Sequence, residues 1–308
     1  MRQSHVPRLT GLVAATHTPF HADGSLNLAA VEKQAEHLAR NGVGAVFIGG
    51  TTGESASLAL EERRAVAKRW CEVARGGALK VIVHVGGNCL ADSRVLAAEA
   101  ESFGATAISA VAPSYFKPRS LELLTASCAE VAASAPKTPF FYYDFPALTG
   151  VAFSMADFLA MAGPRIPTLA GIKFSNPDLK SFNECLHADD GRWDMAWGTD
   201  ESLLAALALG ATCAVGSTYN FAAPVYHRLV AAFERGDLAA ARAEQWRSVE
   251  LVKLLGGFGF MAAAKTTMGM LGVDVGPARL PNGNLTAEEK ISLRGGLEKL
   301  GFFGWVGP

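Results

Sequence analysis

The sequence predicts an α/β fold, namely a closed (β/α)8 barrel followed by a C-terminal helical extension. Eight short apolar runs recur along residues 1–218, and segments with helical periodicity lie between them. Near-continuous apolar strands that alternate with helices indicate a parallel sheet buried on both faces. Eight such units in roughly 230 residues are typical of a closed barrel. An open, doubly wound sheet is the alternative, but no Gly-x-Gly-x-x-Gly follows the first run.

The predicted elements follow one another in a regular order. Strands are expected at residues 11–16, 45–50, 80–85, 107–112, 140–145, 169–174, 194–198 and 213–218. Helices are expected between them at residues 58–74, 91–103, 121–133, 155–162, 202–209 and 222–233. Ser154 with Asp157 predicts a helix N-terminus. Gly42 and Gly104 stand just past helical segments, where a left-handed residue commonly ends a helix.

After the eighth run the sequence keeps helical periodicity without further strands. Helices are expected at residues 237–255 and 286–300, the second opening with Thr286 and Glu289 as a capping box. A turn-rich loop, residues 276–283, lies between them. We therefore divide the chain into a catalytic barrel, residues 1–234, and a helical extension, residues 235–308. We expect the extension to pack on the barrel and to help build a subunit contact.

The composition is that of an ordinary globular protein. Of the 308 residues, 50% are hydrophobic and 19% are charged, with a net charge of −1, which provides no general attraction to nucleic acid or to an anionic membrane. No apolar run approaches the roughly 20 residues that span a bilayer. The first eight residues include basic ones, but no long apolar segment follows them, so we expect no secretory signal and a cytoplasmic location.

Neither the cysteines nor the histidines are spaced as metal ligands. The five cysteines are odd in number, widely scattered and without a Cys-x-x-Cys pair, so we expect free thiols. The seven histidines form no metal-ligand spacing either. We therefore expect neither a metal nor an organic cofactor.

Lys173 stands in the apolar run 169–175, Leu-Ala-Gly-Ile-Lys-Phe-Ser, whereas the other lysines lie in polar or helical surroundings. Burial disfavours the charged form of an amine and lowers its pKa. A free amine at neutral pH attacks ketones and forms Schiff bases. The alternative is a structural lysine that extends to solvent or pairs with a carboxylate.

Polar residues follow the other predicted strands, at the end of a barrel where active sites lie. Residues 49–54, Gly-Gly-Thr-Thr-Gly-Glu, offer backbone N–H groups and two hydroxyls that suit a carboxylate, or else form only a glycine-rich turn. Tyr142 and Tyr143 end the fifth strand, where a phenol could exchange protons with a substrate or simply pack. Asp200 and Glu201 follow the seventh strand, where they either bind hydroxyl groups or complement a helix dipole. Residues 216–220, Gly-Ser-Thr-Tyr-Asn, form another polar end.

Taken together, these residues resemble the pyruvate-dependent lyase family that includes dihydrodipicolinate synthase and N-acetylneuraminate lyase. The resemblance covers nearly the whole chain. It is carried by residues 50–54, by Tyr143 three residues before Pro146, and by Lys173 thirty residues after that tyrosine.

The resemblance implies roles for particular residues. Lys173 corresponds to the Schiff-base lysine, and Tyr143 to the tyrosine that relays protons. Thr51 and Thr52, with Gly53 beside them, correspond to the loop that binds the pyruvyl carboxylate and assists proton transfer. Tyr115 corresponds to a tyrosine that is often lent across a subunit interface, and the family implies a homotetramer.

Within the family, the substrate-binding positions are similar to those of the N-acetylneuraminate lyases. The positions that contact the polyhydroxyl tail of the sugar map onto Asp200, Glu201 and Ser217, with Gly198 lining the same wall and Ser175 following the lysine strand. A polyol tail supplies donors that suit carboxylate acceptors. The synthase carries an arginine that grips a second carboxylate, but this chain has Leu148 there.

The expected activity is therefore reversible cleavage of N-acetylneuraminate to N-acetylmannosamine and pyruvate through a lysine imine. Asp144 and Thr199 differ from the side chains that are usual in these lyases, and either could shift preference to another 2-keto-3-deoxy sugar acid, such as 2-keto-3-deoxygluconate. Dihydrodipicolinate synthase activity and a non-catalytic sugar-acid-binding barrel are the remaining alternatives.

Overall fold

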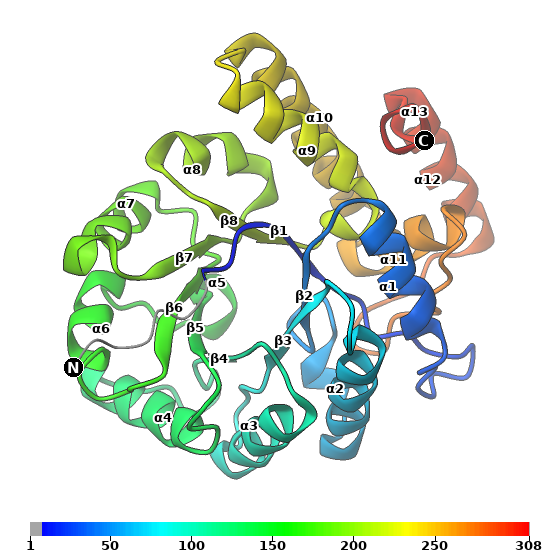
Figure 1. The fold of residues 1–308 in the computed structure, drawn as a ribbon. Coiled ribbons are helices and arrows are strands. Elements are labelled where there is room, and N and C mark those ends of the chain that lie inside the picture. Colours follow the sequence, from blue (N-terminus) through cyan, green and yellow to red (C-terminus); the bar gives the residue numbers. More distant parts are fainter. Residues whose placement is uncertain (1–7, 308) are drawn as a thin grey trace.

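The computed structural model describes residues 8–307 and shows a closed barrel of eight parallel strands (Figure 1). Each strand pairs with the next along the chain, and β8 closes the ring against β1. The strands are β1 (Gly11–Ala15), β2 (Ala45–Ile48), β3 (Lys80–His84), β4 (Ala107–Val111), β5 (Phe140–Asp144), β6 (Leu169–Phe174), β7 (Asp194–Trp197) and β8 (Cys213–Gly216). The predicted fold class is confirmed, and the architecture is a TIM barrel.

Helices surround the ring of strands on its outside, except the short α5, which lies over the end of the barrel (Figure 1). They are α1 (Ala30–Arg40), α2 (Leu60–Ala74), α3 (Leu90–Phe103), α4 (Leu121–Ala133), the short α5 (Pro146–Thr149), α6 (Met155–Ala162), α7 (Leu179–His187), α8 (Leu203–Leu209) and α9 (Tyr219–Glu234), with 3-10 turns η1 (Ser55–Ser57), η2 (Ala188–Gly191) and η3 (Asp200–Ser202). The side chain of Ser154 caps α6 by accepting a hydrogen bond from the N–H of Asp157 at 3.2 Å. Gly42 and Gly104 both have positive φ, as predicted.

Alternation along the strands produces two apolar layers. Inward side chains such as Val13, Phe47 and Phe141 fill the barrel, while outward side chains such as Ile172 and Phe174 pack beneath the helices. Side chains on a strand point alternately to its two faces. A strand that is buried on both sides is therefore apolar at most positions, and this explains why the eight runs are so clear in the sequence.

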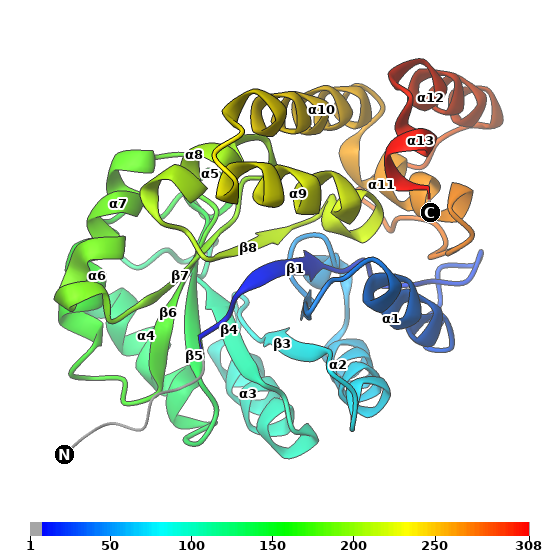
Figure 2. The ribbon, with the colours of Figure 1, turned by 45° about the horizontal axis from the view of Figure 1, so that its top comes forward.

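The C-terminal extension consists of α10 (Leu238–Gly257), α11 (Phe260–Met270), α12 (Ala287–Leu300) and α13 (Phe302–Val306). In Figure 2, α10 lies along α9, and α11 to α13 lie at one end of this pair, on the same side of the barrel as α1. The capping box of α12, formed by Thr286 and Glu289, is present as predicted. The end of α9 at Glu234 coincides with the predicted boundary at residues 234/235, but the division into two domains stays a prediction.

All eight strands begin at their predicted residues. Seven of them stop one or two residues before the predicted end, whereas β6 agrees at both ends. Gly49, with a φ of +63°, directly follows β2 and starts the turn that carries the predicted cradle. No helix within residues 8–307 is long and apolar enough to cross a bilayer. The prediction about a secretory signal concerns a segment that lies almost wholly outside the described residues.

Candidate active site

A cavity of about 420 Å³ lies at the C-terminal ends of the barrel strands. It brings together most of the residues that the sequence singles out: Thr51, Thr52, Tyr143, Lys173, Ser175, Gly198, Asp200, Glu201 and Ser217. Val252, Phe260 and Met261, from α10 and α11, complete its wall. The extension therefore takes part in the candidate site.

Lys173 points into the barrel from β6 and is only 5% exposed. Its Nζ lies 3.8 Å from the ring centroids of both Phe47 and Tyr143. Burial lowers the pKa of Lys173, and the negative charges that Tyr143 and Asp200 can carry act against this shift. A buried amine with a lowered pKa is more often uncharged near neutrality, which is the state that a nucleophile requires.

Two pairs of hydroxyls flank the amine. Thr51 Oγ1 lies 3.4 Å from the hydroxyl of Tyr143, a long hydrogen bond. Thr52 Oγ1 and Ser217 Oγ are 2.7 Å apart and join the end of β2 to the end of β8. Hydroxyl groups of this kind can donate to a carboxylate as well as accept from a sugar. The site thus offers a nucleophile, a phenol and a set of small donors within one cavity.

Asp200 and Glu201 line the same cavity, and they differ in burial. Glu201 is half-buried, whereas Asp200 is 7% exposed. Burial raises the pKa of Asp200 to about 6, although hydrogen bonds from Thr218 and the charge of Lys173 favour its ionised form. Oδ2 of Asp200 accepts hydrogen bonds from the N–H and the hydroxyl of Thr218, at 3.0 and 2.6 Å.

Glycines allow these side chains to fit. A Cβ at Gly198 would lie 2.1 Å from Ser175 Oγ, and a Cβ at Gly216 would lie 1.9 Å from Asp200 Oδ1. Gly53 does not line the cavity, in contrast to the expectation from the sequence. Its backbone instead packs against the start of the same turn, where a Cβ would lie 2.9 Å from the nitrogen of Gly49.

Three other residues lie away from the cavity. Tyr115 is 79% exposed in the single chain and stacks edge-to-face with Phe116, which is 85% exposed. Tyr142 points outward beneath the helices. The Asp144 carboxylate is buried, where it accepts a hydrogen bond from Asn176 at 3.3 Å, and it does not line the cavity. Contrary to expectation, Asp144 therefore cannot contact a ligand there, whereas Thr199 does line the wall.

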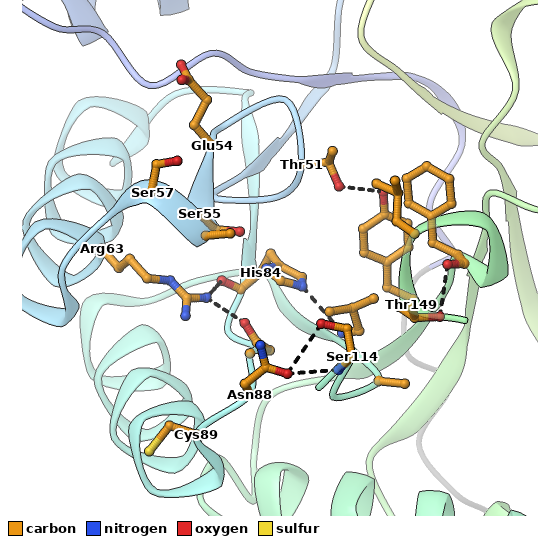
Figure 3. Close-up of a pocket in the computed structure, with 18 of the residues that line it drawn as sticks. Thr51, Glu54, Ser55, Ser57, Arg63, His84, Asn88, Cys89, Ser114 and Thr149 are labelled. Atoms are coloured by element: carbon orange, nitrogen blue, oxygen red, sulfur yellow. Dashed lines mark hydrogen bonds between the residues drawn. The ribbon is translucent and has the colours of Figure 1, made fainter. Parts of the chain in front are cut away.

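A second cavity of about 510 Å³ shares Thr51 and Tyr143 with the first and is drawn in Figure 3. Leu148, at the position where the synthase has an arginine, lines this second cavity and is largely exposed. Arg63 donates to the carbonyls of His84 and Gly86, at 3.1 and 2.9 Å. Burial lowers the pKa of Arg63 to about 10.

His84 ends β3 and is a residue that the sequence analysis does not identify. Its Nε2 accepts a hydrogen bond from the N–H of Val111 at 3.3 Å, so Nδ1 carries the proton and donates to the carbonyl of Gly49 at 2.9 Å. Its ring meets that of Tyr143 edge-to-face, with centroids 5.8 Å apart. Burial, Arg63 and Lys173 hold the pKa of His84 well below its usual range, so the ring is neutral. Only its place at a strand end distinguishes it in the sequence.

Glu54 ends the loop of residues 49–54, here called the threonine loop, in a left-handed conformation with a φ of 54°. Its carboxylate forms a fully buried ion pair with Lys265 of α11, at 2.7 Å, and accepts from the N–H of Arg279 at 2.8 Å. Burial of a charge is tolerated when it is paired and hydrogen-bonded. The ion pair thus ties the extension to the threonine loop, a link that the sequence does not reveal.

Among residues 8–307, no three His, Cys, Asp or Glu side chains lie close enough together to hold a metal ion. All five cysteines, which lie in this part of the chain, are free thiols, and Cys89 is the exposed one.

Comparison with known proteins identifies the family. The model of the dihydrodipicolinate synthetase family matches residues 8–300, nearly the whole chain. The chain belongs to the dihydrodipicolinate synthetase family. The resemblance inferred from the sequence is thereby confirmed.

Similar members of the dihydrodipicolinate synthetase family include proteins named N-acetylneuraminate lyases. N-acetylneuraminate lyase A of Xenopus laevis is 43% identical over 277 residues, which cover 89% of this chain and 90% of the relative. N-acetylneuraminate lyase of Danio rerio is 40% identical over 280 residues, which cover 90% of this chain and 91% of the relative.

Solved structures of the family agree in fold. The N-acetylneuraminate lyase of Proteus mirabilis has a TM-score of 0.93 at 40% identity, covering 96% of this chain and 100% of that chain. The dihydrodipicolinate synthase of Cyanidioschyzon merolae has a TM-score of 0.87 at 27% identity, covering 95% of this chain and 98% of that chain. The backbone is thus shared across the family, and the residues of the cavity must distinguish its activities.

Proposed function

We propose that this protein is an N-acetylneuraminate lyase, a class I aldolase that cleaves N-acetylneuraminate reversibly to N-acetylmannosamine and pyruvate. The observation that carries the proposal is the buried amine of Lys173, held 3.8 Å from the Tyr143 ring in a cavity that Asp200 and Glu201 also line. The cavity thus contains both an imine-forming group and carboxylates that can accept hydrogen bonds from hydroxyl groups. The names of the similar relatives support the same activity.

In the proposed reaction Lys173 Nζ attacks the C2 ketone of the open-chain sugar acid and forms a carbinolamine. The Tyr143 hydroxyl donates its proton to the departing oxygen, water leaves, and a cationic imine and a phenolate remain. The phenolate then takes the proton of the C4 hydroxyl while the C3–C4 bond breaks. The electron pair of that bond forms the C2–C3 double bond, and the π pair of the C=N bond moves to the imine nitrogen. N-acetylmannosamine leaves as the aldehyde, and an enamine stays bound to Lys173.

The second half of the reaction restores the enzyme. The Tyr143 hydroxyl returns a proton to C3 of the enamine, which regenerates the cationic imine. The phenolate then takes a proton from water as the water adds to C2, and pyruvate leaves the free amine. Throughout, Thr51 and Thr52 hold the substrate carboxylate by donating their hydroxyl protons, a role that suits their place beside the amine.

Asp200, Glu201 and Ser217 bind the polyhydroxyl tail in this proposal. Ionised carboxylates only accept hydrogen bonds, and a polyol tail supplies the donors. Gly198 and Ser175 belong to the same wall. Thr199 also lines it, and its small side chain favours a second candidate, namely a lyase or dehydratase that prefers another 2-keto-3-deoxy sugar acid by the same imine chemistry.

Two experiments test the proposal. Borohydride reduction in the presence of pyruvate should add one pyruvyl group to the intact protein and none to Lys173→Ala, and an undiminished adduct on that variant would exclude the covalent role. Pyruvate release should then be compared for N-acetylneuraminate and 2-keto-3-deoxygluconate. A higher kcat/KM for the second compound would replace the first substrate by the second.

We further propose a homotetramer in the cytoplasm, in which Tyr115 acts at a neighbouring subunit. The exposed pair Tyr115 and Phe116 lies beside the second cavity, because the N–H of Tyr115 donates to Asn88 in its lining at 3.0 Å. Two large exposed aromatic rings are typical of a protein interface. Light scattering of the wild type and of Tyr115→Ala tests this assembly.

A further inference from the structure

A chain of buried hydroxyl groups lies behind Asp200. Thr218 donates to Oδ2 of Asp200, and its Oγ1 lies 2.6 Å from the hydroxyl of Tyr226. The hydroxyl of Tyr226 lies 2.8 Å from Ser248 Oγ. All three hydroxyl-bearing residues are at most 1% exposed. The chain thus runs from the cavity wall through α9 into α10 of the extension.

The main chain of Asp200 is held by the same helix. Gln245 of α10 donates to the carbonyl of Asp200 at 3.0 Å, and Ser248 Oγ lies 3.2 Å from that carbonyl. Gln245 also accepts a hydrogen bond from the N–H of Leu204 at 2.8 Å. Both the backbone and the carboxylate of Asp200 are therefore fixed by residues that do not line the cavity.

The directions of these hydrogen bonds follow from the number of protons. Thr218 gives its single hydroxyl proton to the Asp200 carboxylate, so its oxygen is free to accept from Tyr226. Because the Tyr226 proton goes to Thr218, Ser248 is the donor in its 2.8 Å contact with Tyr226, and its longer 3.2 Å contact with the carbonyl of Asp200 shares that same proton. All three hydroxyl protons therefore point toward the carboxylate. Hydrogen bonds aligned in this way strengthen one another in a buried environment.

The two oxygens of the carboxylate have different surroundings. Oδ2 is occupied by two hydrogen bonds from Thr218. Oδ1 lies over Gly216, the residue whose missing side chain leaves it room. The phenol of Tyr219 also approaches the carboxylate at this point. Because Asp200 lines the cavity and Oδ1 receives no hydrogen bond from Thr218, Oδ1 is the oxygen that can accept from a ligand.

We infer that Thr218, Tyr226 and Ser248 are positioning residues that keep the Asp200 carboxylate ionised and oriented for the hydroxyl tail of the sugar. The inference rests on the proposed function and deepens it. It assigns part of the substrate selection to residues of α9 and α10 that do not themselves line the cavity. Tyr226 is the central member, because its hydroxyl bridges the other two.

The charged and titratable groups around Asp200 agree with this role. Glu201 raises the pKa of Asp200 and Lys173 lowers it. Burial raises the pKa values of Tyr219 and Tyr226 well above their usual range, so both phenols stay neutral. Loss of the Tyr226 hydroxyl leaves the Thr218 hydroxyl less polarised and a weaker donor. The pKa of Asp200 should then rise, and a smaller fraction of it should be ionised near pH 6.

The test compares Tyr226→Phe with Tyr142→Phe, a matched control. Tyr142 is equally buried, and its hydroxyl makes no hydrogen bond to any residue that the structure describes. In the condensation direction, Tyr226→Phe should raise the KM for N-acetylmannosamine about fivefold, as expected for one weakened hydrogen bond. The KM for pyruvate should stay within twofold. The acidic limb of kcat/KM should move to higher pH in Tyr226→Phe and remain in place in Tyr142→Phe.

An unchanged sugar KM and acidic limb in Tyr226→Phe would overturn the inference, and so would an equal rise of both KM values. Ser248→Ala removes only the last hydroxyl of the chain. It should raise the KM for N-acetylmannosamine and move the acidic limb in the same direction by a smaller amount, and it replaces Tyr226→Phe as the test variant if that protein does not fold. If the wild type instead turns over another sugar acid, the proposed substrate is wrong, and the same comparison with that sugar acid still decides the role of Tyr226.

Discussion

The amine of Lys173 lies 3.8 Å from the centre of the Tyr143 ring, because the two residues are direct partners across β5 and β6. Residues in register on neighbouring strands project from the same height of the barrel, and both of these point inward. The ladder therefore brings the nucleophile and the phenol together without the help of a mobile loop. Sites built on strands are held more precisely than sites built on loops.

Tyr143→Phe should separate imine formation from carbon–carbon cleavage. The ring and its contact with Lys173 remain, but the proton relay is lost. We expect kcat for cleavage to fall by roughly 10²–10⁴, the range for a lost general acid–base group. The borohydride adduct with pyruvate should still form, at a reduced rate, as measured by intact mass. Turnover equal to that of the wild type would show that the phenol is dispensable.

Lys265→Met should destabilise the protein because it leaves the Glu54 carboxylate buried without its cation. Both side chains of this pair are at most 1% exposed. Removal of one partner of a buried pair costs about 3–5 kcal/mol, and this loss should appear as a lower midpoint in denaturant unfolding. The double variant with Glu54→Gln should recover part of it. A double variant no more stable than Lys265→Met would show that the charge of Glu54 is not the cause.

His17 should make the folded state sensitive to acid. It is fully buried, and burial together with Lys265 lowers its pKa from 6.5 to about 3. Between these pH values the unfolded chain binds a proton that the folded protein does not, so stability falls as pH decreases from 6.5 towards 3. The loss amounts to about 1.4 kcal/mol for each pH unit.

Substitution of His17 isolates this contribution. Burial raises the pKa values of Asp144 and Asp200 to about 6, so these two carboxyls favour the folded state as pH falls. This opposing effect is the same in the wild type and in the variant, and it cancels in their difference. We therefore expect the difference in unfolding free energy between the wild type and His17→Leu to shift in favour of the variant as pH falls. A difference that does not change between pH 7 and pH 4 would contradict the assignment of this effect to His17.

The barrel was predictable because its signal is local. Each strand is a short apolar run, and each helix has its own periodicity and caps, so the pattern is visible without knowledge of contacts. The ends of the runs also marked the positions of Lys173, Asp200 and Ser217. What could not be read was the direction of single side chains. Tyr142 and Tyr143 look alike in sequence, yet only Tyr143 faces the cavity.

The supporting contacts were not predictable because they join distant parts of the chain. Glu54 and Lys265 meet across the barrel mouth, and Ser248 reaches Asp200 only after α9 and α10 have folded against each other. A lysine in an amphipathic helix has the same local sequence whether it is exposed or buried. The sequence predicts that the extension packs on the barrel. That its residues line the cavity and that Lys265 pairs with Glu54 of the threonine loop is visible only in the three-dimensional structure.

His84 holds the ends of three strands together, and substitutions should show that this affects turnover. It donates to Gly49, where the turn that carries Thr51 begins, and accepts from Val111, the residue paired with Tyr143. His84→Leu removes both hydrogen bonds and frees the turn. Because a displacement of about 1 Å can cost 10²-fold in rate, we expect kcat to fall about 10- to 100-fold.

Two further variants separate the two hydrogen bonds of His84. His84→Asn places an amide nitrogen near the position of Nδ1 and can keep the bond to Gly49, whereas His84→Gln can keep an acceptor for Val111. If the turn is what matters, kcat should be restored more by asparagine than by glutamine, while the melting temperatures of the two variants stay similar. Equal kcat for the leucine and asparagine variants would mean that the bond to Gly49 does not position Thr51. A neutral His84 also adds no titration of its own to the pH–rate profile, so the acidic limb should be the same in the wild type and in His84→Asn.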